Sequence, residues 1–166
     1  RLKVLPDRLG APADLPLRHH PLEPSATVDA PGRETVFLFT GCVMDVWQSE
    51  VHAAAQRVLE AAGVAVIPTN QLAPCCGALH THAGLGDEAR ARAAQLMGAL
   101  PDRPILVDSA GCGAAMKDYG HLLGTDAARA FSARVFDIQE WLAPRVDQLP
   151  EVQKIPVTVA VQDPCH

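Results

Sequence analysis

The chain has 166 residues, of which 48% are hydrophobic and 20% are charged, and its formal net charge is −5. This composition is typical of a globular domain with a substantial core and excludes a disordered chain. An acidic balance without any run of Lys or Arg argues against nucleic acid as the main partner. No apolar run approaches the roughly 18 residues of a membrane helix, so the sequence predicts no transmembrane segment.

Residues 1–34 differ from the rest of the chain because proline interrupts them repeatedly. The prolines are Pro6, Pro12, Pro16, Pro21, Pro24 and Pro31. The segments between these prolines show neither the period of a helix nor the alternation of a strand. We therefore expect an extended Pro-rich linker or arm over residues 1–34.

From residue 35 onward, short apolar runs alternate with segments of helical spacing. The runs at 35–39, 64–67 and 105–107 have the pattern of strands buried on both faces, and we expect further strands at 134–138 and 157–161. Helices are expected at 49–62, 87–100, 116–123, 126–132 and 138–146. This alternation predicts an α/β fold, with a parallel sheet and flanking helices.

The doublet Cys75-Cys76 stands between Pro74 and Gly77, two residues that permit a sharp turn. Cys42 lies 33 positions before the doublet and Cys112 lies 36 positions after it, and both have glycine neighbours. In parallel α/β folds, functional groups gather where the C-terminal ends of the strands open into loops. We therefore expect Cys42, Cys75, Cys76 and Cys112 to meet in one thiolate site. The alternative is a set of unrelated buried free cysteines, which are common in protein cores.

The number of cysteines indicates the cellular compartment in which the protein works. The chain has five cysteines, and an odd number favours cytosolic thiols or metal ligands over the disulfide set of a secreted domain. We therefore expect a cytoplasmic protein that reaches membranes only through its partners.

The order of these motifs resembles a known family. A Cys, a Cys-Cys-Gly and a third cysteine loop follow one another at Cys42, at Cys75-Cys76-Gly77 and at Ser109-Ala110-Gly111-Cys112. This layout resembles the cysteine-rich CCG domain, which occurs in tandem in heterodisulfide reductase, in lactate-utilisation iron–sulfur proteins and in the glycolate oxidase iron–sulfur subunit. The third loop, with the Lys117-Asp118-Tyr119-Gly120 that follows it, is most similar to the glycolate oxidase protein.

The resemblance also implies a division of the chain. Residues 35–150 would form one complete CCG unit, and residues 151–166 would hold the first strand of a second. Asp163-Pro164-Cys165-His166 is similar to the opening of that second unit, so Cys165 is expected to be a ligand there and not in the first site.

One position departs from the family pattern. Ser109 stands where the fullest members have the first Cys of a Cys-x-x-Cys pair, and those members hold a non-cubane iron–sulfur cluster. The four remaining thiolates are the complement of a [4Fe–4S] cluster or of a tetrahedral zinc ion. Ser109 is therefore expected to donate a hydrogen bond rather than to act as a ligand. His80 and His82 are candidates for metal ligands or for hydrogen-bond donors to the sulfurs, whereas His52 and His121 are interpreted as helix-surface residues or as partly buried residues with satisfied hydrogen bonds.

For function, the resemblance implies an iron–sulfur subunit of a flavin-linked oxidoreductase of glycolate or a similar 2-hydroxy acid. Its partners would be a flavoprotein that carries FAD and other electron-transfer domains. The chain itself would pass electrons and hold no catalytic residue. The alternative is a structural metal-binding or subunit-docking domain with a zinc or degenerate site. The sequence leaves both open.

Overall fold

The computed structural model describes residues 21–151, 156–158 and 160. Within these residues the strands are β1 (Thr35–Phe39), β2 (Ala65–Pro68), β3 (Ile105–Val107) and β4 (Val135–Asp137). They form one sheet in the order β2-β1-β3-β4, and every pair is parallel. The predicted α/β fold with a parallel sheet is therefore confirmed.

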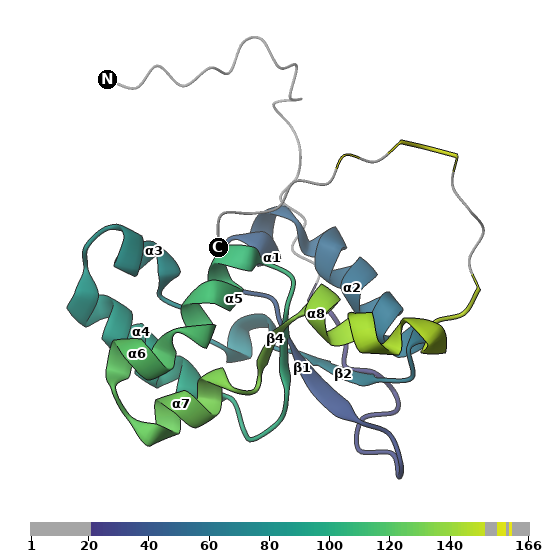
Figure 1. Ribbon diagram of the computed structural model, residues 1–166, viewed down its shortest axis with the longest axis horizontal. Helices are drawn as coiled ribbons and strands as arrows, with labels where there is room; N and C mark the ends of the chain where they lie inside the picture. The colour runs from purple at the N-terminus through teal and green to yellow at the C-terminus, as the bar shows by residue number, and fades with distance from the viewer. Residues whose placement is uncertain (1–20, 152–155, 159, 161–166) are drawn as a thin grey trace.

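Helices connect the strands and cover the sheet (Figure 1). The α-helices are α1 (Met44–Trp47), α2 (Ser49–Ala61), α3 (Ala78–His82), α4 (Gly86–Ala99), α5 (Ala110–Lys117), α6 (Tyr119–Leu123), α7 (Asp126–Ser132) and α8 (Ile138–Leu142). Two 3₁₀ helices, η1 (Asn70–Leu72) and η2 (Ala143–Gln148), complete the described elements.

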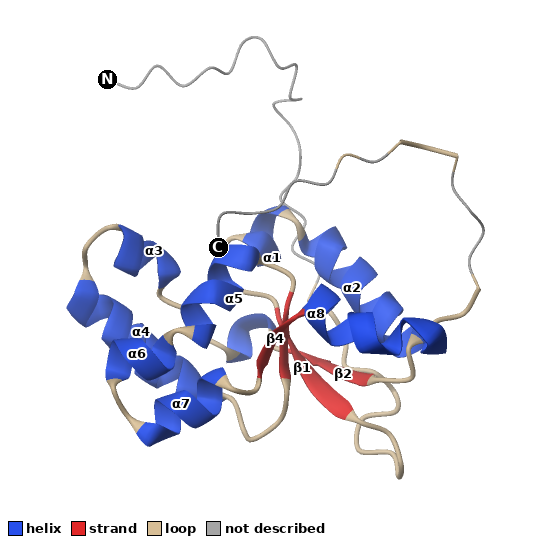
Figure 2. Cartoon of the chain, viewed as in Figure 1, coloured by secondary structure: helices blue, strands red, loops and turns tan. Residues whose placement is uncertain are grey.

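The strand side chains alternate between two apolar cores. Phe37 and Phe39 of β1 pack with α4, α5, α6 and α7 on one face, whereas Val36 and Leu38 pack with α2 and α8 on the other. Figure 2 shows the same arrangement, with α4, α6 and α7 on one side of the strands and α2 and α8 on the other. Burial on both faces explains why the strands read as continuous apolar runs.

One predicted helix differs from the structure in an informative way. The pattern predicts a helix over 116–123, but α5 begins at Ala110 and a new helix, α6, begins at Tyr119. The glycines on both sides of Cys112 have low helix propensity, so the sequence indicates a loop there. Packing overrides this preference: Met116 is fully buried, and Gly113 lies against Val107.

The two ends of the described chain differ from the predicted arm and from the predicted last strand. Ser25, in the expected arm, is bound to the edge strand β2: its N–H donates to the Val66 carbonyl at 2.9 Å, and its hydroxyl accepts from the Val66 N–H at 2.9 Å. In the expected strand at 157–161, the described residues Val157, Thr158 and Ala160 lie in no strand, and the other two are outside the described residues. Among the described residues these three have no strand partner, which a strand requires.

Candidate metal centre

The first cysteine loop leaves the sheet at the C-terminal end of β1. Gly41 has φ +69°, a backbone conformation that favours glycine, and it turns the chain so that Cys42 follows at once. A Cβ at Gly41 would lie 3.8 Å from the Sγ of Cys112, which shows how closely the first and third loops approach each other. Cys42 itself is exposed.

The doublet loop depends on a second left-handed glycine. Gly77 has φ +84° and precedes α3, and a Cβ there would lie 3.2 Å from the Ala89 carbonyl oxygen and 3.3 Å from the Cβ of Arg92. Any larger residue at this position would strain the turn and push α4 away. The Tyr119 hydroxyl also supports the doublet loop, because it donates a buried hydrogen bond of 2.6 Å to the Cys76 carbonyl.

The third loop places Cys112 in the first turn of α5. Ser109 is the N-cap residue of this helix, but its hydroxyl makes no capping hydrogen bond to the helix backbone. It instead hydrogen-bonds the thiol of Cys112. The Ser109 hydroxyl and the N-terminal end of the helix dipole both favour a thiolate at Cys112.

The three loops converge on one cavity with a volume of about 240 Å³. Its walls include Ser109 and the residues Cys42, Cys75, Cys76 and Cys112. The Sγ atoms of Cys42 and Cys75 lie 3.6 Å apart, and the thiols of Cys76 and Cys112 are hydrogen-bonded to each other. The structure thus brings together the four cysteines that the sequence analysis selected.

The ionisation of the thiols is uneven. The hydrogen bond from Cys76 lowers the pKa of Cys112 to about 7, against the effect of burial and with help from the Ser109 hydroxyl. The same hydrogen bond, together with burial, raises the pKa of Cys76. Burial and the neighbouring Cys75 raise the pKa of Cys42. The hydrogen bond between them therefore favours ionisation at Cys112 and the protonated thiol at Cys76.

Backbone N–H groups point at the sulfurs of the other three cysteines. The Gly77 N–H donates to the Sγ of Cys75 at 3.5 Å, and the N–H groups of Val43 and Ala78 favour the thiolates of Cys42 and Cys76. Hydrogen bonds to sulfur are among the features that tune iron–sulfur clusters. The donor set and its surroundings therefore fit a thiolate-bound metal centre.

The four sulfurs lie as two close pairs, Cys42 with Cys75 and Cys76 with Cys112. Among the described residues, no three His, Cys, Asp or Glu side chains are arranged so that they could hold one metal ion.

The histidines after the doublet do not act as a pair. Both lie on the short helix α3, where residues two apart point in different directions, rather than on an extended loop. His82 lines the cysteine cavity, whereas His80 does not, and the Nδ1 of His80 is buried without a hydrogen-bond partner among the described residues. Cys165 lies outside the described residues.

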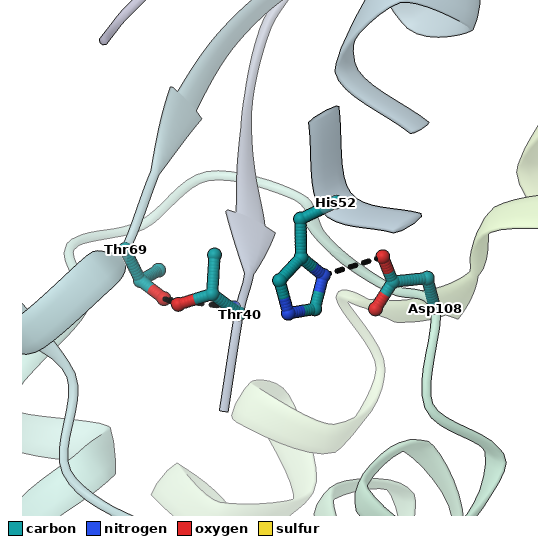
Figure 3. Close-up of polar contacts among 4 residues, drawn as sticks. All are labelled: Thr40, His52, Thr69 and Asp108. Carbon is teal, nitrogen blue, oxygen red and sulfur yellow. Dashed lines mark hydrogen bonds and ion pairs between the residues drawn. The ribbon is translucent and has the colours of Figure 1, made fainter. Parts of the chain in front are cut away.

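The sequence analysis missed a buried polar pair next to the site (Figure 3). His52 is 1% exposed, and its Nδ1 lies 2.7 Å from the Oδ2 of Asp108. The interpretation of His52 as a residue outside the site overlooked a signal: His52, Ala55 and Leu59 share one buried helix face. Asp108 directly follows the buried strand β3, at the sheet end where functional groups gather. Tyr119 was missed as well, because a tyrosine in a helix gives no hint of its distant carbonyl partner.

Comparison with known proteins shows several relatives of this chain. Over 175 aligned residues, the chain is 33% identical to the protein named "Probable glycolate oxidase iron-sulfur subunit" of Bacillus subtilis, covering 98% of this chain and 37% of that protein. It is 31% identical to the "Glycolate oxidase iron-sulfur subunit" of Escherichia coli (81% and 31% covered) and 31% identical to the "Lactate utilization protein A" of Geobacillus kaustophilus (64% and 47%). The chain thus spans only about a third to a half of the length of these relatives. No solved structure gave a significant match.

The family comparison agrees with the motif order. Residues 36–117 match the model of the cysteine-rich CCG domain, a range that includes all three cysteine loops. The motifs, the fold and the relatives therefore lead to the same conclusion: the chain contains a cysteine-rich domain of the CCG family.

Proposed function

We propose that this chain is an iron–sulfur electron-transfer module of a flavin-linked oxidoreductase. One observation carries the proposal: three loops that are distant in sequence bring four thiols to one cavity at the C-terminal edge of the sheet. Two left-handed glycines, a buried tyrosine and several N–H···S contacts hold these loops in place. Unrelated core cysteines would not share such a set of supports.

In this proposal, some residues bind the cluster and others donate hydrogen bonds to the sulfurs. The proposed ligands are Cys42, Cys75, Cys76 and Cys112. Such a cluster, when bound, accepts and releases single electrons. Ser109 donates to the sulfur of Cys112, and the backbone N–H groups offset negative charge on the other sulfurs. Val43 and Leu79, both exposed, add apolar side chains to the lining of the cavity.

The four thiolates favour a [4Fe–4S] cluster over the non-cubane cluster of family members with a fifth cysteine. A structural zinc site stays the second candidate, because the 3.6 Å between the Sγ atoms of Cys42 and Cys75 suits two ligands of one ion. The relatives named as iron–sulfur subunits favour iron over zinc.

The names of the relatives supply the proposed context. Two relatives are named as iron–sulfur subunits of glycolate oxidase. We infer that this module receives electrons from a partner flavoprotein that carries FAD and oxidises glycolate or a similar 2-hydroxy acid in the cytoplasm. Other electron-transfer domains would receive the electrons in turn. None of the helices among the described residues is long and apolar enough to cross a membrane.

Anaerobic purification tests the proposal. We expect a brown protein with broad absorbance near 400 nm and with matching iron and acid-labile sulfide, whereas a zinc site would be colourless. Substitution of Cys76 with serine should abolish the iron content. Cys165→Ser is the matched control: we propose that Cys165 belongs to a second unit, so its loss should leave the iron content unchanged. Stoichiometric zinc without iron would overturn the electron-transfer proposal, and equal iron loss in both variants would overturn the two-unit division.

A further inference from the structure

Buried polar residues lie in a row beneath the cysteine loops, and the proposed electron transfer gives them no role. Thr69, Thr40 and Asp108 each directly follow a strand, namely β2, β1 and β3. His52, from α2, lies between Thr40 and Asp108 (Figure 3). Thr40 precedes the loop of Cys42, and Asp108 precedes the loop of Cys112. The row therefore joins the bases of two cysteine loops.

The hydrogen bonds of this row are incomplete at its centre. The Thr69 hydroxyl accepts from the Thr40 N–H at 3.1 Å, and His52 Nδ1 contacts Asp108 Oδ2 at 2.7 Å. The Nε2 of His52 and the Oδ1 of Asp108 are both buried without a well-formed hydrogen bond among the described residues. Buried polar atoms are nearly always satisfied, so two orphaned atoms in one pair call for an explanation.

The surroundings of His52 favour its protonated form. Burial by itself disfavours the imidazolium, but the hydrogen bond and charge of Asp108, the charge of Asp45 and the Thr40 backbone outweigh this effect, so the pKa of His52 is raised. Among the described residues, the charges of Asp108 at the end of β3 and Asp45 on α1 act on His52, and the charge of His52 acts on the Cys112 thiol on α5. The adjacent strand β2 has the sequence Ala-Val-Ile-Pro and contributes none.

The charges of this pair reach the thiolate site. Protonated His52 lowers the pKa of Cys112, whereas the carboxylate of Asp108 raises it. The pair is therefore close enough for a charge on the sulfurs to be felt at the imidazole, and the effect must be reciprocal. An added electron makes the site more negative, and this added negative charge raises the pKa of His52.

We propose that the His52–Asp108 pair is a proton-holding unit that couples proton uptake to reduction of the centre, an inference that rests on the proposed function. When one electron arrives from a reduced flavin or a chemical reductant, His52 takes one proton from solvent at an imidazole nitrogen. Only that N–H bond forms, and no bond breaks in the protein. Reoxidation releases the proton and passes the electron to the next acceptor. Asp108 is the positioning residue that orients the imidazole and keeps its proton.

The reduction potential of the anaerobically reconstituted chain, measured across about pH 6 to 9, tests this coupling. One proton per electron predicts a fall of up to about 59 mV for each tenfold decrease in proton concentration. His52→Asn keeps an N–H near the position of Nδ1 but cannot titrate, so its potential should be independent of pH. Asp108→Asn removes the charge that supports the imidazolium and should move the sloping region to lower pH. His121→Asn, at an exposed histidine of α6, should behave like the unaltered chain.

A second measurement needs no cluster. Among the histidine ring resonances of the reduced, cluster-free chain, one should titrate above the ordinary range of histidine, and this signal should vanish in His52→Asn. If His52→Asn does not fold, the histidine titration of the unaltered chain and the potential of Asp108→Asn still test the coupling of proton uptake to reduction. A cluster with a pH-independent potential, or a slope that persists in His52→Asn, overturns the coupling alone. Failure to assemble any iron–sulfur cluster overturns the proposed function and the coupling with it.

Discussion

The four cysteines form two pairs in very different surroundings. Cys42 and Cys75 make the outer pair, with sulfurs 3.6 Å apart near the mouth of the cavity, and Cys42 is exposed. Cys76 and Cys112 make the inner pair, in which Cys76 is 4% exposed and belongs to the main apolar core. Cys75 and Cys112 are both half-buried, and Cys112 packs against that core, so Cys42 and Cys76 are the two extremes of exposure.

A metal site must hold its ligands in place and must also admit the metal, and the two pairs differ in which of these they favour. The inner pair is positioned before any metal arrives, because core packing, Tyr119 and the start of α5 fix it. The outer pair can move when a cluster enters, because fewer contacts hold it. Under the proposed function, a rigid inner half would limit the reorganisation that electron transfer requires, and an adaptable outer half would permit assembly of the cluster. The predictions below test the division.

Cys76→Ser should have the largest effect, since it disturbs both the site and the core. The cluster-free protein should lose about 1–3 kcal/mol of stability, because a hydroxyl replaces a thiol in an apolar environment. The matched change Cys42→Ser, at an exposed position, should alter stability by less than about 0.5 kcal/mol. Both variants should lose iron. Denaturant unfolding and iron analysis measure the two effects, and equal stability losses would contradict the division into pairs.

Tyr119→Phe should weaken the inner pair alone. The variant keeps the stacking of the ring on Phe131 but leaves the Cys76 carbonyl without its 2.6 Å hydrogen bond. A buried carbonyl that loses its donor costs about 1–3 kcal/mol, so we expect a drop of that order in the unfolding free energy. Iron binding should become weaker rather than disappear. Unchanged stability would show that the tyrosine hydroxyl does not support the doublet loop.

The outer pair should be the first to oxidise in the cluster-free protein. Its sulfurs need to approach from 3.6 Å to about 2.05 Å to form a disulfide, and the exposed loop can follow. A mild oxidant such as diamide would take up the two electrons and two protons that the thiols release. Peptide mass analysis should find Cys42 joined to Cys75 before Cys76 or Cys112 reacts. A first disulfide between Cys76 and Cys112 would show that accessibility does not control the order, and Cys75→Ser should suppress the expected product.

The sequence predicted the parts of this molecule that depend on local pattern. Apolar runs gave β1 and β3 within a residue, and helical spacing gave α2, α4 and α7. The convergence of the cysteines followed from the rule that loops gather at the C-terminal edge of a parallel sheet. The helical start of α5 was missed because glycines dominate its first turn, and packing of Met116 outweighs their propensity.

The polar supports of the site could not be predicted in the same way. The bonds from Tyr119 to Cys76 and from His52 to Asp108 join residues 43 and 56 positions apart. No periodicity connects such partners, because each bond exists only after the sheet and its helices have assembled. Local sequence therefore indicates where the sulfurs gather, while tertiary packing determines what holds and tunes them.

Ser109→Ala should have the smallest effect, and it sharpens the account of the inner pair. The Ser109 hydroxyl makes no capping bond to the α5 backbone, so its loss should scarcely change stability. It does stabilise the Cys112 thiolate, and the pKa of Cys112, about 7 in the native chain, should therefore rise in the variant. Alkylation of Cys112 at a series of pH values, in the reduced cluster-free protein, measures this shift. Ser132→Ala, at a hydroxyl that bonds the Met116 carbonyl and lies outside the cavity, is the control and should leave the Cys112 profile in place. An unaltered profile in Ser109→Ala would mean that Cys76 and the helix N-terminus alone account for the acidity of Cys112.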